Sequence, residues 1–321
     1  MRVVTDLREL GNLASATVLT IGNFDGVHLG HQKLLRRVVE AARAGGAIPA
    51  AVTFDPPPRK LLTPERAPRL LTPIDPKCRL VEEQGIELLV ILPFTWKLAR
   101  LSPNEFVRKI LVERLRAVRI EVGPNFRFGH RQAGDVKFLD ELSRREGFDI
   151  EVVPTVELRG ERISSSRIRQ LLDEGRVGRA GRLLGRPFTV SGRIVPGSGV
   201  GRKKTVPTLN LAPADQQVPK VGVYVTRTML DGILYESVTN VGHKPTFGEH
   251  PLTVESYLLN FAGELHPARM EVHFYRRLRD ERKFPSAEAL KAQIQDDVQR
   301  SLNFFRLLKL FQERQTQRTV S

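Results

Sequence analysis

Cysteine is almost absent from this chain of 321 residues, since Cys78 is the single one. One cysteine cannot form an intrachain disulfide, which argues against a disulfide-stabilised secreted protein. Long apolar runs are missing as well: stretches such as 88–92 have the length of a strand and fall far short of the roughly 20 residues that cross a bilayer. The first residues also lack the apolar stretch of a secretory signal. These absences predict a cytoplasmic protein without a membrane span.

Acidic residues are few relative to basic ones. The chain has 36 Asp and Glu against 51 Lys and Arg, a formal net charge of +15 at pH 7. Such an excess would suit nucleic-acid binding. The arginines are scattered through both halves, however, without the compact basic run or interleaved aromatics of a nucleic-acid platform. We favour a solvated basic surface that also suits phosphate-bearing small molecules, and keep a nucleic-acid-binding protein as an alternative.

The pattern of apolar residues predicts two domains, 1–185 and 186–321. In the first, β-rich runs alternate with helical patterns, which favours a Rossmann-like parallel α/β sheet. The expected strands are 47–54, 87–94, 119–122 and 149–155, and the expected helices are 32–44, 104–116 and 136–145. Serines 164–166 should cap a short helix that Gly175 ends. A Gly- and Arg-rich passage then leads to the domain boundary.

The second domain should be a small antiparallel β-barrel with a long terminal helix. Short strands follow one another without intervening helices, and Asp231-Gly232 is a strong two-residue hairpin signal. After Ser286, a plausible helix cap, apolar residues recur on one helical stripe up to Phe311. This helix should pack against the barrel, with a frayed polar tail after Gln312.

Two histidines, His28 and His31, stand three residues apart where a predicted strand becomes a predicted helix. Such a turn directs backbone N–H groups and the positive end of the helix dipole at an anion. Gly22, Gly26 and Gly30 leave room for a triphosphate to approach the backbone, and the two imidazoles could donate to one phosphate group. The alternatives for an isolated pair are a helix cap or a metal site.

Several ordered segments carry a resemblance that covers nearly the whole chain. In the first half they are Gly22-Asn23-Phe24-Asp25-Gly26-Val27-His28-Leu29-Gly30-His31, Thr53-Phe54-Asp55-Pro56, Val122-Gly123-Pro124-Asn125-Phe126-Arg127-Phe128-Gly129 and Ile163-Ser164-Ser165-Ser166-Arg167-Ile168-Arg169. The first is similar to the HxGH-type nucleotidyltransferases. All four, in this order, resemble the adenylyltransferase half of the bacterial bifunctional riboflavin kinase/FMN adenylyltransferases.

The second half resembles the riboflavin kinase module of the same family. Its matching segments are Gly192-Arg193, Gly201-Arg202, Pro207-Thr208-Leu209-Asn210, Gly222-Val223-Tyr224, Asn240-Val241-Gly242, Val254-Glu255-Ser256 and 278–284. Together the two resemblances imply an enzyme that phosphorylates riboflavin to FMN in the second domain and adenylylates FMN to FAD in the first. ATP, riboflavin, FMN and FAD would be its substrates and products, and Mg²⁺ its cofactor.

For adenylyl transfer, the resemblance implies that His28 and His31 stabilise the charge that gathers on the departing pyrophosphate, without a protein nucleophile. The implied ATP-binding residues are Gly22, Asn23, Gly26, Ser164, Ser165 and Arg169, and the candidates for flavin or nucleotide contacts are Asn125, Arg127 and Arg162. One departure lies at Pro57, which stands where the family has a histidine, so no catalysis is assigned there.

For the kinase, the resemblance places Glu255 at the position of the catalytic base. Thr208 and Asn210 alternate along an expected strand, so both point to one face, where their oxygens could bind Mg²⁺. Gly201 and Arg202 would bind ATP, and Arg279 and Glu281 the flavin. The phosphate loop departs from the family at 203–205, where Lys-Lys-Thr adds positive charge and a family glycine is lost.

Two alternatives to the two-enzyme prediction differ in kind. An adenylyltransferase whose barrel only binds flavin would convert FMN to FAD and leave riboflavin unchanged. A nucleic-acid-binding protein on a nucleotidyltransferase-like scaffold would bind polynucleotides with a steep salt dependence and turn over no flavin. The expected partners are small molecules, with no membrane, and homo-oligomerisation stays open.

Overall fold

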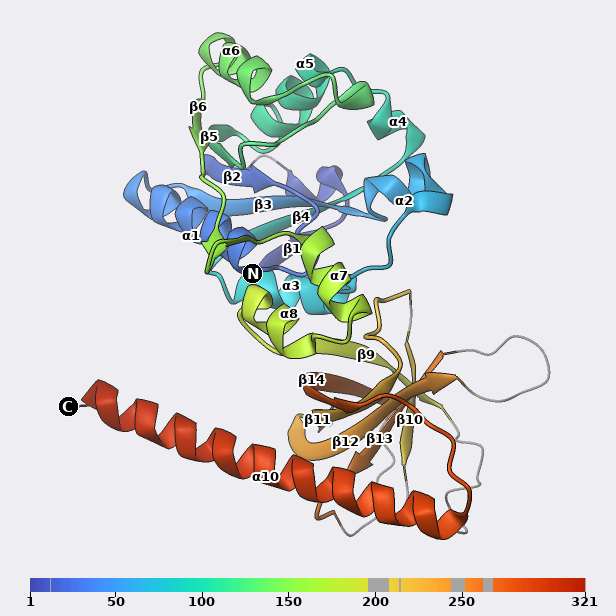
Figure 1. Cartoon of the computed structure of the whole chain (residues 1–321). Coiled ribbons are helices and arrows are strands. Elements are labelled where there is room, and N and C mark those ends of the chain that lie inside the picture. Colours follow the sequence, from blue (N-terminus) through green and yellow to red (C-terminus); the bar gives the residue numbers. More distant parts are fainter. Residues whose placement is uncertain (12, 196–207, 214, 244–251, 262–267, 321) are drawn as a thin grey trace. The chain divides into compact units, whose positions relative to one another are not determined.

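The computed structural model describes residues 1–11, 13–195, 208–213, 215–243, 252–261 and 268–320. The chain forms two compact units, Met1–Ser165 and Ser166–Ser321 (Figure 1). The boundary predicted at residue 185 separates two functional domains, 1–185 and 186–321. The division into compact units does not test it, so it stays a prediction.

The first unit is built around a six-stranded sheet in the order β1-β4-β3-β2-β5-β6, and every neighbouring pair of strands is parallel. The strands are β1 (Arg2–Val4), β2 (Thr17–Ile21), β3 (Ile48–Asp55), β4 (Leu88–Pro93), β5 (Ala117–Val122) and β6 (Asp149–Val152). The helices are α1 (Leu29–Ala44), α2 (Pro58–Leu62), α3 (Ile74–Glu82), α4 (Trp96–Ala99), α5 (Pro103–Phe106) and α6 (Val136–Glu146). The predicted parallel α/β fold is confirmed.

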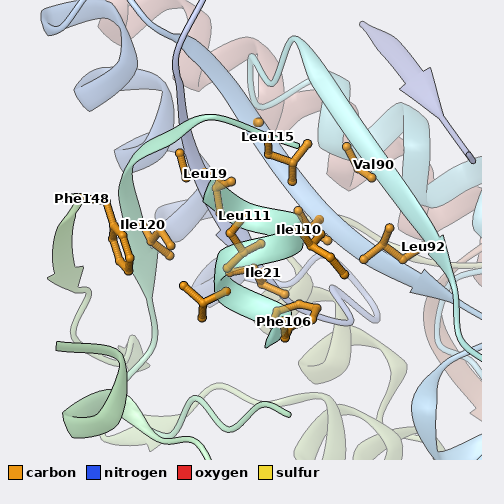
Figure 2. Close-up of a cluster of buried hydrophobic side chains, with 14 of the residues drawn as sticks. Leu19, Ile21, Val90, Leu92, Phe106, Ile110, Leu111, Leu115, Ile120 and Phe148 are labelled. Atoms are coloured by element: carbon orange, nitrogen blue, oxygen red, sulfur yellow. The ribbon is translucent and has the colours of Figure 1, made fainter. Parts of the chain in front are cut away.

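Successive residues of a strand point to opposite faces of the sheet, and apolar residues pack against both faces here. On β2, Leu19 and Ile21 pack into one core and Val18 into the other. The first core, shown in Figure 2, is closed by residues of α5 and the turns after it, among them Phe106 and Ile110. The second core receives the apolar stripe of α1 and residues of α3. Helices on both faces leave the carboxyl edge of the sheet as the place for a site.

The predicted helix over 104–116 differs in detail. It begins at Pro103 behind a capping box formed by Ser102 and Glu105, continues as a π-helical turn (Val107–Val112), and ends there. Shorter elements complete the unit. They are 3₁₀ turns at Leu7–Leu10, Pro64–Arg66 and His130–Gln132, and the hairpin β7 (Glu157–Leu158) with β8 (Glu161–Arg162).

The second unit contains a closed antiparallel barrel in the order β10-β13-β12-β11-β14-β9. Its strands are β9 (Phe188–Val195), β10 (Leu209–Pro213), β11 (Gly222–Leu230), β12 (Ile233–His243), β13 (Leu252–Leu258) and β14 (Arg269–Arg279). Asp231 and Gly232 both have positive φ, 45° and 85°, as a tight hairpin between β11 and β12 requires. The predicted barrel and hairpin are confirmed.

Among the described residues, three helices belong to this unit or begin at its edge: α7 (Ser165–Asp173), α8 (Val177–Leu184) and α10 (Ala287–Val320). The sequence missed α8, which lies in the passage expected to lead to the boundary. Its glycines allow close packing rather than flexibility: a Cβ at Gly178 would lie 3.1 Å from the Tyr275 carbonyl oxygen of β14.

The terminal helix α10 packs against β11 and β12, as predicted. Ser286 caps it, since its Oγ accepts a hydrogen bond from the Ala289 N–H. Phe305 is buried and its ring meets that of Tyr275 edge to face. The expectation of a frayed tail after Gln312 is wrong, because the helix continues to Val320. Residues 312–320 hold no proline or glycine, so nothing local ends the helix.

Candidate active sites

Between β2 and α1 the chain makes a tight turn at the carboxyl edge of the parallel sheet. The Gly22 N–H donates to the Val52 carbonyl of β3, which holds the start of the turn on the sheet. Gly22 lies against the Phe24 ring, which a Cβ there would approach to 3.1 Å. We call residues 22–31 the histidine turn. It contains the predicted residues Gly22, Asn23 and Gly26 together with both histidines.

His28 and His31 lie against one another at the beginning of α1. Their rings are stacked with centroids 3.6 Å apart and planes inclined by 14°. His28 is the N-cap of the helix, and its Nδ1 accepts a hydrogen bond from the His31 N–H at 3.3 Å. A neutral His28 therefore carries its proton on Nε2. Capping and phosphate binding are compatible, because they use different nitrogens.

The surroundings of His31 favour the neutral form of its imidazole. Burial, followed by the nearby His28 and Lys77, holds the pKa of His31 well below 6.5. The Nδ1 atom of His31 is buried and has no hydrogen-bond partner within the part of the chain that the structure describes. A buried ring nitrogen without a partner is costly unless a ligand supplies one. Two imidazoles at a helix N-terminus can stabilise negative charge on a phosphate.

Two further predicted segments reach the same edge of the sheet. Ser165, the first residue of α7, donates from its Oγ to the Asp25 carbonyl oxygen at 2.8 Å, and Ser164 precedes it. Asn125 and Arg127 lie exposed in the loop after β5, the strand beside β2. Because the ends of neighbouring parallel strands meet at one edge, this loop and the histidine turn lie on the same side of the sheet.

The other predicted transferase residues are three arginines. Arg127 forms an ion pair with Asp135 at 3.4 Å. Arg162 lies exposed in the hairpin strand β8, and Arg169 lies one helical turn after Ser165 on α7.

On the barrel, the strand register brings three polar residues into a row. Glu255 on β13 is paired with Asn210 on β10 and with Asn240 on β12. Directly paired residues on neighbouring strands share a face, so the three side chains stand side by side. We call them the glutamate row. Asn210 is 3 % exposed, and its Oδ1 has no hydrogen-bond partner among the described residues.

Two predicted flavin residues, one at the end of β14 and one just after it, differ in their surroundings. Glu281 lies beside the row, with its Oε1 3.5 Å from the Asn240 Nδ2. A Cβ at Gly242 would lie 2.5 Å from that Oε1, so a larger residue there would displace the flexible end of the Glu281 side chain. The Arg279 guanidinium instead forms a fork with Asp297 of α10, with bonds from its Nε at 3.0 Å and its Nη2 at 2.8 Å. Arg279 thereby ties the end of β14 to the terminal helix.

The remaining predicted kinase residues precede β10 in the sequence. Thr208 is exposed and precedes β10, two residues before Asn210. Gly201 and Arg202 lie outside the described residues, as does the departure at 203–205.

The comparisons with known proteins cover both units. A family model described as FAD synthetase matches residues 12–167, and one described as riboflavin kinase matches residues 184–305. The bifunctional riboflavin kinase/FMN adenylyltransferase of Pseudomonas fluorescens is 40% identical over 299 residues, which is 93% of this chain and 96% of that protein. The chain belongs to this family.

Further relatives agree over the same length. The family member from Escherichia coli K12 is 36% identical and covers 94% of this chain and 98% of its own. A crystal structure described as a macrolide-efflux protein from Streptococcus pneumoniae has a TM-score of 0.85 and 29% identity, over 94% of this chain and 98% of that one. The predicted bifunctional enzyme is confirmed. Riboflavin, FMN and ATP follow as its substrates.

Two properties of the described residues bear on the alternatives. No helix there is long and apolar enough to span a membrane. The same residues contain no group of three or more His, Cys, Asp and Glu side chains that could hold a metal ion. Within them, the histidine pair therefore lacks the additional ligands of these types that a closed metal site needs.

Sequence reasoning assigned no role to two residues beside these sites. Asn240 belongs to a segment that resembles the family, but its place beside Glu255 depends on strand register. Lys77 lies buried behind the histidine turn, at a position of α3 where the helical stripe between Ile74 and Val81 calls for an apolar residue. A lysine inside an apolar stripe was the available signal.

Proposed function

We propose that the two reactions of this enzyme use two separate sites. The histidine turn serves adenylyl transfer, in which a phosphate oxygen of FMN attacks the α-phosphorus of ATP and pyrophosphate leaves. The glutamate row serves phosphorylation, in which the 5′-hydroxyl of riboflavin attacks the γ-phosphorus of ATP and ADP leaves. Residues 1–185 would carry the first reaction and residues 186–321 the second.

In the transferase, His28 and His31 hold the triphosphate and stabilise the charge that develops on the pyrophosphate. The observation that carries this role is the stacked pair at the N-terminus of α1, with the buried, unpartnered Nδ1 of His31. The backbone at Gly22, Asn23 and Gly26 follows the nucleotide. Serines 164 and 165 with Arg169 bind the β- and γ-phosphates. Asn125, Arg127 and Arg162 contact the flavin nucleotide or ATP.

In the kinase, Glu255 accepts the proton of the riboflavin 5′-hydroxyl as that oxygen attacks. Its neighbours fit a Mg²⁺ ion, because the buried Asn210 Oδ1 is a neutral oxygen without a partner and Thr208 offers a hydroxyl nearby in sequence. When bound, Mg²⁺ would neutralise phosphate charge. Gly201 and Arg202 would bind ATP, and Glu281 the flavin.

Arg279 has a second role in this proposal. Its guanidinium is engaged by Asp297, so its first effect is to hold the segment that carries Glu281. Flavin contact by Arg279 would use only its remaining exposed surface.

The direct test is a time course with the purified chain, riboflavin, ATP and Mg²⁺, followed by chromatographic separation of the flavins. FMN that appears first and FAD that follows would support both activities. Parallel reactions with EDTA test the need for a divalent cation. If FMN forms and FAD does not, the transferase is inactive under these conditions. If riboflavin gives no product at all, a second reaction with supplied FMN shows whether only the kinase is inactive. A cytoplasmic location stays a prediction from the sequence, and the oligomeric state stays open.

A further inference from the structure

The backbone of the histidine turn is strained. Phe24 and Val27 have φ of +44° and +37°, in the left-handed region that residues other than glycine rarely adopt and that a β-branched valine tolerates least. Both side chains are buried in the core beside α1. Such a conformation persists only where surrounding contacts hold it. The shape of the turn therefore depends on residues outside the turn.

Three carbonyl groups of the turn are held by side chains from three different helices. The bonds are Lys77 Nζ to Asn23 O at 2.9 Å, Ser165 Oγ to Asp25 O at 2.8 Å, and Gln32 Nε2 to Val27 O at 2.9 Å. In a planar trans peptide the N–H of the next residue points opposite to the carbonyl. Each donor therefore sets the direction of one N–H group in the turn as well as that of the carbonyl.

Lys77 is the unusual donor among the three. It is 2 % exposed, and its burial lowers its pKa, while the carboxylates of Asp25 and Asp55 act in the opposite direction. Burying an ammonium group costs more than burying an apolar side chain of the same length. Its charge also lies close enough to His31 to lower the pKa of that histidine. Lys77 is thus a costly residue placed behind the histidine turn.

We propose that Lys77 is a positioning residue for adenylyl transfer. Its Nζ holds the Asn23 carbonyl, and so aims the peptide between Asn23 and Phe24 in a turn that would otherwise relax. The inference rests on the proposed function of the histidine turn. Thr53 Oγ1 approaches the same carbonyl at 3.4 Å, a longer and weaker bond. That second donor keeps the carbonyl from being stranded when Lys77 is replaced.

The test compares Lys77→Met, which removes the donor, with Lys77→Gln, which keeps an N–H donor without the charge. Arg79→Met, an exposed position on the same helix, is the matched control. We expect Lys77→Met to lower kcat/KM for ATP in FMN adenylylation by about tenfold to a hundredfold. The KM for FMN should change by less than about twofold, since the change acts on the ATP-binding turn. Lys77→Gln should recover most of the activity, and Arg79→Met should match wild type.

Two readouts separate positioning from loss of structure. Trp96, the single tryptophan, lies in the first unit, so its fluorescence reports the folding of that unit alone. Riboflavin phosphorylation by the same sample reports the barrel. A partly unfolded variant would lose active molecules and keep the KM for ATP of the remainder, whereas a misaligned turn raises that KM.

Several outcomes would overturn the proposal. A folded Lys77→Met with transferase kinetics within about twofold of wild type excludes a positioning role. Lys77→Gln as impaired as Lys77→Met, both folded, excludes hydrogen-bond donation as the cause. If Lys77→Met does not fold, Lys77→Gln decides alone: near-wild-type kinetics support donation, and impaired kinetics in a folded protein reject it. If the variant His28→Ala/His31→Ala kept transferase activity, the proposed site itself would fail, whatever Lys77 does.

Discussion

The two proposed ATP sites, the histidine turn and the glutamate row, are built from opposite chemistry. The turn lies at a helix N-terminus with two imidazoles and a buried lysine behind it. The row offers a carboxylate between two amides, with a second carboxylate at 3.5 Å from one of them. The turn therefore brings its own groups that attract phosphate, whereas the row offers oxygen ligands. A site of the second kind depends on a cation to bring phosphate in.

The backbone differs between the two sites as well. The turn is held in a strained conformation by donors from three helices, while the row stands on regular antiparallel strands. Changes near the turn should therefore act through its shape, and changes in the row through the side chain that is removed.

The largest effect is expected when both imidazoles of the histidine turn are removed, which tests whether the two sites are separate. In His28→Ala/His31→Ala we expect FAD formation to fall by at least about 10³-fold, because loss of a single charge-stabilising donor typically costs about 10²- to 10³-fold. Riboflavin phosphorylation should continue, so FMN should accumulate in a chromatographic time course. A parallel loss of FMN formation would contradict two separate sites.

Glu255→Gln tests the glutamate row in the same way. We expect riboflavin phosphorylation to fall by about 10²- to 10⁴-fold, because the amide cannot accept the hydroxyl proton. FAD formation from supplied FMN should be unchanged, which an adenylylation assay measures directly. Glu236→Gln, on the neighbouring strand β12, is a matched control that should retain kinase activity. Equal rates for Glu255→Gln and wild type would remove Glu255 from the mechanism.

The sequence predicted the fold more completely than it predicted the sites. Alternating strand and helix patterns predicted the parallel sheet, and the Asp231-Gly232 hairpin signal identified the barrel, because both features are local. Helix α8 was missed because Gly178 and Gly181 resemble loop residues, although close packing requires Gly178. The helical tail after Gln312 was missed because its polar residues carry no apolar stripe.

The sites depend more on tertiary contacts. Family segments supplied the histidines and Glu255, but the place of Asn240 beside Glu255 is a matter of strand register, which no local pattern states. The left-handed Phe24 and Val27 run against local preference, and two of the three donors that hold the turn, Lys77 and Ser165, are distant in sequence. Arg279 was expected to contact flavin, and its fork with Asp297 joins residues that are 18 positions apart.

A smaller effect is expected at the ion pair between Arg279 and Asp297. It tests whether Arg279 binds flavin beside the glutamate row or stabilises the fold. Asp297 is 1 % exposed, so Asp297→Ala leaves a largely buried guanidinium without its carboxylate. We expect the barrel to lose about 3 kcal/mol of unfolding free energy, measured by circular dichroism in urea. Trp96 fluorescence should show an unchanged transition for the first unit. Asp296→Ala, exposed on the same helix, is the control. A stable Asp297→Ala with weakened riboflavin binding would instead assign Arg279 to the flavin.

The smallest effect is a pH dependence that distinguishes the histidine turn. Burial holds the pKa of His31 well below its ordinary 6.5, so the unfolded state takes up more protons than the folded one once the pH drops below 6.5. The contribution of His31 to stability is therefore complete above pH 6.5 and declines as the pH falls toward the lowered pKa, by at most about 1.4 kcal/mol per pH unit. Urea unfolding followed by Trp96 fluorescence at pH 7.5 and 5.5 measures it. In His31→Phe the part of the pH dependence due to His31 should vanish. Bound ATP should reduce it in wild type, because phosphate favours the protonated imidazole. A pH dependence unchanged by the substitution would mean that His31 titrates as it does in the unfolded chain.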